Sequence, residues 1–341
     1  MPDHTFITNL LAQDGAEPGA APAPERALRR LVDAGADRLP LPGHGATLAR
    51  WRALAAVGAH DLSLAKLFEG HTDALVILHE AGLARGDDAS VWGTWCAEPP
   101  DARLRLERAG DGVVLSGRKA WCSGARAATH AVVSCWREDG AAMLAAVDLR
   151  QPGVTMRDDG WQAVGMAGSG SIDVLFDRVP ARPLGGPDFY VRRAGFWHGG
   201  AGVAAVWFGA ATALADAVAQ AVRARPAGQG DPHRLAGLGD IAIALQGSAA
   251  LMREAAAAID RAPDADAMAL ALSVRLSVEA AATATLAAAG RALGPGPMCK
   301  DAAMARRFAD LPVFMRQSHA ERDLEALGRL LAGAREAAWT L

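Results

Sequence analysis

Trp121 and Ser123 stand two positions apart at the end of an expected strand, in the string KAWCSGA that begins at Lys119. A flat aromatic ring can cover one face of a planar ring system, and a hydroxyl beside it can hydrogen-bond the reactive edge of that system. Trp92 and Trp95 precede this pair in the same segment. One small barrel cannot bury all of these tryptophan rings in its core. Trp121 and Ser123 are therefore a candidate site.

A second group of reactive side chains lies near the C-terminus, where Ser318, His319 and Glu321 fall within four residues. A carboxylate can remove a proton as a general base, whereas a hydroxyl or an imidazole can stabilise charge on an oxygen and move a proton to it. A solvated helix face, with Arg322 and Arg329 as partners for Glu321 and Glu325, is the alternative use of these residues.

The common catalytic motifs are absent from the sequence. The glycine-rich run from Gly165 to Ser171 lacks the third glycine of a dinucleotide fingerprint and leads into a strand, which indicates a turn. There is no G-x-S-x-G elbow, phosphate-loop lysine motif or H-E-x-x-H, and the nine histidines are scattered. We therefore expect no metal site, and the protein is expected to be neither a serine hydrolase nor a P-loop enzyme.

Composition excludes several other classes. The 341 residues are 51% hydrophobic with a formal net charge of −3, and no basic stripe with interleaved aromatics occurs, so no nucleic-acid partner is expected. Four cysteines without a C-x-x-C pair suit a reduced, cytoplasmic setting, and the N-terminus does not resemble a signal peptide. The uncharged stretch 198–215 is rich in Gly and Ala, which favours a buried helix over a membrane span.

The hydrophobic pattern changes period twice along the chain. It is helical over 25–88, alternates over about 91–180, and is helical again to the C-terminus. Helices are expected near 195–223, 231–261, 264–290, 301–317 and 319–338, and their short connections predict an up-and-down bundle. We expect an α+β chain with a flexible tail (1–24), an N-terminal helical domain (25–88), an antiparallel β-barrel or sandwich (89–186) and a C-terminal α-helical bundle (187–341).

Three strings in this order resemble motifs of the acyl-CoA dehydrogenase family. TWCAEP, beginning at Thr94, is similar to the family's T-E-P strand, and KAWCSGA is similar to its K-x-W-I-[TS]-N/G-A element. The run from Gly165 to Pro180 matches its G-M-R-G-S turn and the closing strand that ends in V-x-V-P. The resemblance covers nearly the whole chain and implies the family's fold.

The resemblance also implies a cofactor, FAD, and residues that bind it. Trp121 would pack on the flavin ring, and the hydroxyl of Ser123 would donate a hydrogen bond near N5. Thr94, Cys96 and Ala97 would contact the pyrimidine edge mainly through backbone groups. These residues make the end of the β segment the expected flavin site.

The sequence departs from the family's motifs at two places that would bind phosphate. Where the family reads T-E-P-x-A-G-S-D, this chain has Ala97 for a hydroxyl residue and lacks the serine that helps to hold phosphate. The family's pyrophosphate arginine corresponds loosely to Arg223, in the string RARPAGQ. An arginine that stabilises a helix C-terminus through the macrodipole is an equally good reading of Arg223.

The position of the family's general base also differs. In the family's register Ser318 stands where the glutamate belongs, and a shift of three residues places Glu321 there. The leading hypothesis is an FAD-dependent acyl-CoA dehydrogenase-like oxidoreductase, with Glu321 or His319 as an unusual base and an unidentified electron acceptor. The alternatives are a flavin-dependent monooxygenase of the same fold, using Ser318, His319 and Ser123, and a non-catalytic partner subunit. Helices near 200–222 and 264–290 are rich in Ala and Gly on more than one face, which predicts a homo-oligomer, a dimer or tetramer.

Overall fold

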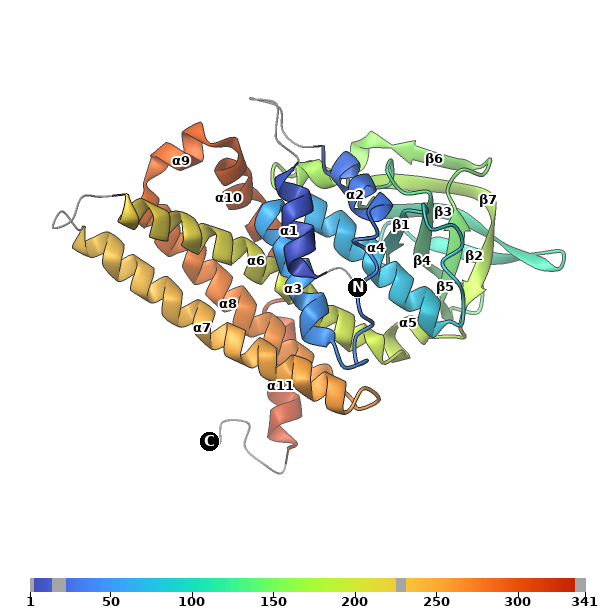
Figure 1. The fold of residues 1–341 in the computed structure, drawn as a ribbon. Helices are drawn as coiled ribbons and strands as arrows, with labels where there is room; N and C mark the ends of the chain where they lie inside the picture. The colour runs from blue at the N-terminus through green and yellow to red at the C-terminus, as the bar shows by residue number, and fades with distance from the viewer. Residues whose placement is uncertain (1–2, 14–22, 225–230, 335–341) are drawn as a thin grey trace. The chain divides into compact units, whose positions relative to one another are not determined.

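The computed structural model describes residues 3–13, 23–224 and 231–334. It divides into two compact units, Met1–Leu39 with Ser63–Phe196, and Pro40–Leu62 with Trp197–Leu341. Figure 1 shows the elements of each unit along the colour gradient of the chain. The segment expected to form the N-terminal helical domain thus contributes helices to both units, and the domain boundaries stay a prediction.

The first unit contains a small β-barrel. Strand β4 pairs with β2, β2 with β3, β3 with β7, β7 with β5, and β5 with β4 again, so the ring of strands is closed. Closure leaves no free edge on these strands. The strands are β1 (Trp92–Trp95), β2 (Leu104–Ala109), β3 (Gly112–Cys122), β4 (His130–Trp136), β5 (Ala142–Asp148), β6 (Val154–Arg157) and β7 (Ile172–Leu184).

The pairing within the sheet differs from the expected all-antiparallel arrangement. Most ladders are antiparallel, but β1 pairs with β4 in parallel from Trp92 opposite His130 to Trp95 opposite Val133. β2 also meets β4 in parallel, at Arg105 opposite Trp136. The expectation was wrong on this point because parallel partners are distant in sequence and leave no local turn signal.

Alternating side chains fill the barrel, as the period-two pattern predicts. Trp95, Leu104, Leu115 and Phe176 are among the buried residues of its core. Helix α4 (Leu62–Glu80) packs against the sheet through a second cluster, which includes Ile77 and residues of β1, β4, β5 and β7. The barrel and α4 therefore hold β1 and the end of β3, the two carriers of the expected flavin site.

The first unit also contains three shorter helices, α1 (His4–Ala12), α2 (Pro24–Asp33) and α5 (Phe189–Arg192). The presence of α1 corrects the expectation of a flexible tail, of which residues 14–22 lie outside the described part. The Asp3 carboxylate accepts a hydrogen bond from Phe6 N at 2.8 Å and so caps the helix. Ile7 and Leu11, four residues apart, are buried. The Pro/Ala/Gly-rich stretch that follows obscured this short amphipathic pattern.

The second unit is helical, and it confirms the helices that the apolar period predicts. Figure 1 shows the long helices α7 and α8 side by side, as their short connection requires. The last expected helix ends earlier than predicted, and residues 335–338 lie outside the described part. The elements are α3 (Thr47–His60), α6 (Gly195–Arg223), α7 (Pro232–Arg261), α8 (Met268–Leu293), α9 (Pro295–Lys300), α10 (Ala302–Met315) and α11 (Glu321–Ala332).

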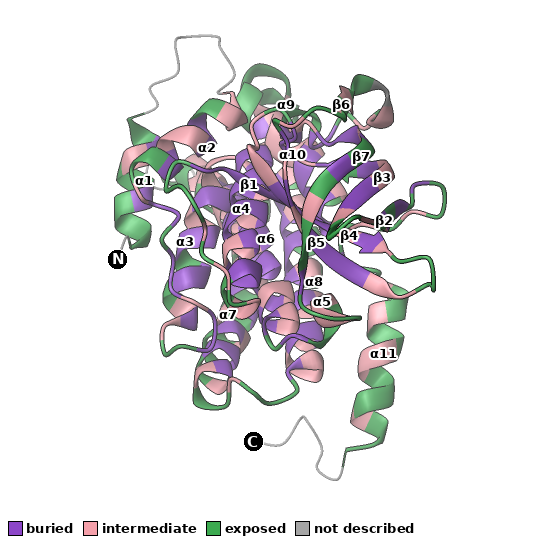
Figure 2. Cartoon of the chain, turned by 90° about the vertical axis from the view of Figure 1, so that its right-hand side faces the viewer, coloured by how far each residue is buried: buried purple, intermediate pink, exposed green. Residues whose placement is uncertain are grey.

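Three of these helices, α6, α7 and α8, are long and apolar enough to cross a membrane, by length and composition alone. The most apolar window of α6 is 67% buried inside the protein, and Figure 2 shows this helix largely as buried. In α7 the corresponding share is only 22%. Ile243 and Leu235 lie exposed on that helix. α6 thus behaves as a packed helix, whereas α7 presents apolar surface.

Two glycines bring α3 and α6 into backbone contact. A Cβ on Gly58 of α3 would overlap with the carbonyl oxygen of Val206, and a Cβ on Gly209 of α6 would overlap with that of Ala55. Backbone cannot move aside as a flexible side chain can. The crossing of these helices therefore requires glycine on both sides.

We expect Gly209→Ala to lower the free energy of unfolding by about 2–3 kcal/mol, because the added methyl group forces the helices apart. Gly247→Ala on α7 is the matched control, since nothing lies within 4 Å of the Cβ it would add. That substitution should stabilise the protein by about 0.5–1 kcal/mol through helix propensity. Urea titrations followed by circular dichroism measure both changes, and equal effects of the two substitutions would contradict this account of the crossing.

Candidate functional site

Trp121 occupies a strained position at the end of β3. The ladder between β3 and β7 shifts register between Lys119 and Cys122, which marks a bulge. Trp121 lies in this bulge with φ of 57° and is 49% exposed. A left-handed backbone is unfavourable for a bulky residue, and so is exposure of an indole ring. Two unfavourable features at one residue indicate a role outside folding.

Beside Trp121, three serine hydroxyls form a hydrogen-bonded chain. Ser123 Oγ and Ser171 Oγ are 2.8 Å apart, and Ser171 Oγ and Ser169 Oγ are 2.7 Å apart. Ser169 Oγ donates to the carbonyl oxygen of Met166 at 2.7 Å. Ser169 and Ser171 are buried, whereas Ser123 is half-buried. The outer hydroxyl is therefore positioned by an inner network.

Backbone and indole contacts bring the three sequence strings together. Trp95 Nε1 donates to the carbonyl oxygen of Ser123 at 3.0 Å, which joins β1 to the turn after β3. Gly124 N donates to Ser169 O at 2.8 Å, which joins the same turn to the glycine-rich segment. Gly124 has φ of 68°, and a Cβ there would overlap with Leu67 on α4. The motifs on which the resemblance rests thus form one site in the first unit.

The residues expected at the pyrimidine edge follow directly along β1. Thr94 Oγ1 donates to the carbonyl oxygen of Gly70 at 2.7 Å, so this hydroxyl is engaged with α4. Cys96 and Ala97 are half-buried. Burial raises the pKa of Cys96 to about 11, and the thiol is therefore neutral at physiological pH. Backbone groups are consequently the main polar groups that Cys96 and Ala97 can offer.

An ion pair between a buried lysine and a partly exposed glutamate connects β3 with the segment after β1. Lys119, in β3, is fully buried, and its Nζ lies 2.6 Å from Glu98 Oε1 and 2.6 Å from Ser134 Oγ. Trp136 Nε1 donates to Glu98 Oε2 at 2.8 Å. Burial acts to raise the pKa of Glu98, but the hydrogen bonds from Lys119, Ser134 and Trp136 bring it below its ordinary value. This pair ties the segment after β1 to the strand that carries Trp121.

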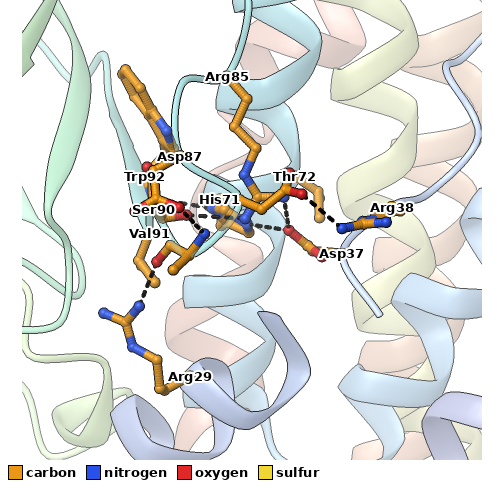
Figure 3. Close-up of polar contacts among 12 residues, drawn as sticks. Arg29, Asp37, Arg38, His71, Thr72, Arg85, Asp87, Ser90, Val91 and Trp92 are labelled. Atoms are coloured by element: carbon orange, nitrogen blue, oxygen red, sulfur yellow. Dashed lines mark hydrogen bonds and ion pairs between the residues drawn. The ribbon is translucent and has the colours of Figure 1, made fainter. Parts of the chain in front are cut away.

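A buried histidine holds the start of β1 (Figure 3). His71 Nδ1 accepts the backbone N–H of Trp92 at 3.0 Å, so the proton of the neutral ring is on Nε2. Nε2 in turn lies 3.0 Å from Asp37 Oδ2, which also receives Arg85 Nη1 at 2.6 Å. Burial lowers the pKa of His71. A second proton on this ring would displace the Trp92 hydrogen bond.

We expect acid to weaken the fold through His71. Because its folded-state pKa is lowered, the unfolded chain takes up a proton below about pH 6.5 while the folded chain does not, so stability falls as pH falls. Between pH 6.5 and 5.5 the loss from this group should be on the order of 1 kcal/mol. His71→Asn keeps an acceptor for Trp92 and should flatten this part of the pH profile.

Urea titrations across that pH range measure the effect. His233→Asn, at an exposed position in the first turn of α7, is the control and should leave the profile unchanged. A profile with the same slope in wild type and His71→Asn would show that His71 does not carry the dependence.

Ser318, His319 and Glu321 lie in the second unit, at the start of α11. Ser318 is buried and donates to Asp323 Oδ2 at 3.1 Å, and the same oxygen accepts His319 N at 3.0 Å. Asp323 thus satisfies free donors at the helix start. Glu321 and the His319 ring are exposed, and Glu325 pairs with Arg329 as expected for a solvated face. Their catalytic roles stay predictions.

Arg223 is exposed in the last turn of α6. This is the place where a cation interacts favourably with the helix dipole. The remainder of its string, from Arg225 to Gln229, lies outside the described residues. The phosphate role of Arg223 therefore stays a prediction. Across the described ranges, no three His, Cys, Asp or Glu side chains gather as metal ligands.

Sequence reasoning missed the inner members of the site. The sequence indicated a turn at Ser169 and Ser171, although the Ser171 hydroxyl contacts Ser123 from 48 positions away and Ser169 contacts Ser171. Glu98 and Lys119 were quoted within motifs without being paired. Lys119 stands between Arg118 and Ala120, so its neighbours in the sequence gave no signal that it would be buried.

Comparison with known proteins finds sequence similarity over part of this chain. Residues 98–179 match the family model of the acyl-CoA dehydrogenase middle domain. L-evernosamine nitrososynthase of Micromonospora sp. is 38% identical over 104 residues, which are 29% of this chain and 24% of that protein. Dibenzothiophene monooxygenase of Rhodococcus erythropolis is 34% identical over 170 residues, 42% of this chain and 40% of that protein. The matches thus span less than half of these curated relatives.

Solved structures resemble the chain over nearly its whole length. KijD3 in complex with FMN and a dTDP-amino-keto sugar has a TM-score of 0.79 at 21% identity and covers 99% of this chain and 96% of its own. FMN-bound TdsC from Paenibacillus sp. A11-2 has a TM-score of 0.80 at 17% identity, with 96% of each chain covered. Methanesulfinate monooxygenase MsuC from Pseudomonas fluorescens has a TM-score of 0.80 at 20% identity, with 98% of each covered. At these identities the likeness establishes the fold.

The chain therefore has an acyl-CoA dehydrogenase-like fold, with helices and a small β-barrel. Over residues 98–179 it is similar to the middle domain of the acyl-CoA dehydrogenases. The named relatives are monooxygenases and nitrososynthases, whose names refer to sulfur compounds and amino sugars. They give no support to the expected acyl-CoA dehydrogenation.

Proposed function

We propose that the protein is a flavin-dependent monooxygenase that transfers oxygen to a nitrogen or sulfur atom of a small molecule. The observation that carries the proposal is the exposed, left-handed Trp121 beside the hydroxyl chain that ends at Ser123. The similar proteins with named activities are monooxygenases and nitrososynthases, which favours this reading over acyl-CoA dehydrogenation. Dehydrogenation needs a base held against the substrate, whereas Glu321 is exposed in the first turn of α11.

The cofactor in this proposal is FMN, in place of the FAD expected from the sequence. Two of the similar structures hold FMN. FMN carries one phosphate where FAD carries a pyrophosphate, so it needs fewer phosphate-binding groups of the kind that this chain lacks. Trp121 would cover one face of the ring, and Ser123 would face N5. When bound in reduced form, the flavin supplies electrons to O₂ for oxygen transfer.

The protein's own groups would bind and orient the flavin and the substrate, and they would exclude water. β1 and the bulge of β3 offer fixed surfaces, because the Lys119–Glu98 pair and the Trp95–Ser123 contact hold them together. Ser318 and His319 are the proposed groups for moving a proton to or from oxygen in this reading.

We also propose a homo-oligomer, a dimer or tetramer. The predicted signal was the small, apolar residues of α6 and α8, and the structure adds exposed apolar side chains on α7, Leu235 and Ile243. Apolar surface of this kind is buried at interfaces between subunits. Light scattering on purified protein should give a mass of at least two chains. A mass of one chain, with and without FMN, would contradict the proposal.

Anaerobic titration separates oxygen transfer from acyl-CoA dehydrogenation. Protein loaded with oxidised FMN or FAD is mixed with acyl-CoAs of several chain lengths without oxygen. We expect no loss of the flavin absorbance near 450 nm with any acyl-CoA, and rapid reoxidation once reduced FMN on the protein meets O₂. Bleaching by an acyl-CoA would establish dehydrogenation instead. Protein that binds neither flavin would support the non-catalytic reading.

A further inference from the structure

The serine chain has a direction, because each hydroxyl has only one proton to donate. Ser169 donates its proton to the carbonyl oxygen of Met166, which can only accept. The hydrogen bond between Ser171 and Ser169 must then be donated by Ser171. The bond between Ser123 and Ser171 must in turn be donated by Ser123. All three protons therefore point inward, toward Met166.

This direction decides what Ser123 can offer to a bound ring. Its proton is directed to the buried Ser171, so the half-buried oxygen presents lone pairs outward. From Trp121 and the family resemblance, Ser123 was expected to act as a donor near N5. The serine hydrogen bonds reverse that expectation, because a hydroxyl that already donates its proton to Ser171 can only accept a further hydrogen bond.

We infer that Ser169 and Ser171 are positioning residues that make Ser123 a hydrogen-bond acceptor and so favour reduced flavin at this site. The inference rests on the proposed function, in which the flavin ring lies on Trp121 with N5 near Ser123. Oxidised flavin has a bare lone pair at N5, whereas reduced flavin carries a hydrogen there. An acceptor at Ser123 therefore bonds N5–H of the reduced form and opposes the lone pair of the oxidised form.

The experiment compares dissociation constants of oxidised and reduced FMN for the full-length protein. Reduced FMN is prepared anaerobically by photoreduction, and binding is followed by ultrafiltration under nitrogen. We expect wild type to bind reduced FMN about five- to tenfold more tightly than oxidised FMN, the factor that one hydrogen bond supplies. The ratio of the two constants, rather than turnover, is the readout.

Two variants should change that ratio in the same direction. Ser171→Ala removes the acceptor of the Ser123 proton, which becomes free to donate to oxidised N5. Ser169→Ala removes the acceptor of the Ser171 proton, which can then turn to Ser123 and release the Ser123 proton outward. Met166 O keeps a backbone hydrogen bond from Ser169 N at 3.0 Å, so this variant leaves no unpaired carbonyl. In both variants the preference for reduced FMN should fall at least about fivefold.

Two further variants complete the set. Ser123→Ala should abolish the preference, because neither form then finds a partner at N5. Ser116→Ala is the matched control. This half-buried serine of β3 donates to Glu107 Oε2 at 3.3 Å and takes no part in the hydrogen bonds of Ser123, Ser169 and Ser171. It should keep the wild-type ratio.

The outcomes separate this inference from the proposed function. Suppose that Ser171→Ala and Ser169→Ala still bind FMN, but with affinities for the oxidised and reduced forms that fall equally. That result would overturn the inferred direction of the serine hydrogen bonds and would leave the proposed flavin site intact. Wild-type protein that binds neither form would overturn the proposed function, and the inference with it. A fall in the ratio for the two inner serines, with Ser116→Ala unchanged, establishes the inference.

Discussion

Trp121→Ala should weaken FMN binding by about 10- to 100-fold, because the indole supplies the apolar face on which the flavin ring would lie. The fold should survive, since Trp121 is half exposed and lies at the end of β3. Fluorescence quenching of FMN by the purified variant measures the loss. Phe6→Ala, which removes an exposed aromatic ring from α1, is the control and should bind FMN as wild type does.

A second substitution at the same position tests the backbone. In a left-handed conformation glycine is favoured over alanine, so Trp121→Gly should be more stable to unfolding than Trp121→Ala by about 1 kcal/mol. In an ordinary strand the order would be the reverse. Both variants should lose FMN equally. If Trp121→Gly were the less stable of the two, the position would not be left-handed and the argument from strain would fall.

Glu98→Ala should lower the free energy of unfolding by about 3 kcal/mol or more, because it leaves the charge of the fully buried Lys119 without a carboxylate. Lys119→Met should cost less, since water can still reach the side chain of Glu98, which is 29% exposed. The double variant should resemble Lys119→Met. Urea titrations provide the three values.

The surface pair on the same barrel serves as a control for Glu98→Ala. Glu107 accepts from Arg105 Nε at 3.2 Å in a more exposed setting, so Glu107→Ala should change stability by less than about 1 kcal/mol. Glu98→Ala and Lys119→Met should also bind FMN more weakly, because the pair ties the segment after β1 to the strand that carries Trp121. If Lys119→Met lowered the free energy of unfolding as much as Glu98→Ala does, the difference in burial between Lys119 and Glu98 would not explain the results.

The fold was largely predictable where the signal is local. The limits of α6 and α7 follow from apolar spacing and from Pro and Gly at their ends, and the strands follow from alternation. The parallel pairing of β1 with β4 was not predictable, because it joins segments about 40 residues apart without a turn between them. α1 was missed because a nine-residue pattern is short against the Pro/Ala-rich stretch beside it.

The outer residues of the site were predictable, and its inner ones were not. Trp121 and Ser123 stand out because their types and spacing suit a flavin ring. The roles of Ser169 and Ser171 depend on a turn folding back onto the end of β3, which sequence spacing does not reveal. The direction of their hydrogen bonds requires the acceptor at Met166 O, a backbone atom that no side-chain pattern encodes.

Incorporation of labelled oxygen tests the central claim most directly. Full-length protein is supplied with chemically reduced FMN, ¹⁸O₂ and a panel of dibenzothiophene, methanesulfinate and a dTDP-linked amino sugar, the compound classes named by its relatives. The account predicts a product of at least one compound that carries one ¹⁸O atom on sulfur or nitrogen, and no such product with Trp121→Ala. Products without ¹⁸O, or consumption of O₂ with no labelled product from any compound of these classes, would contradict it.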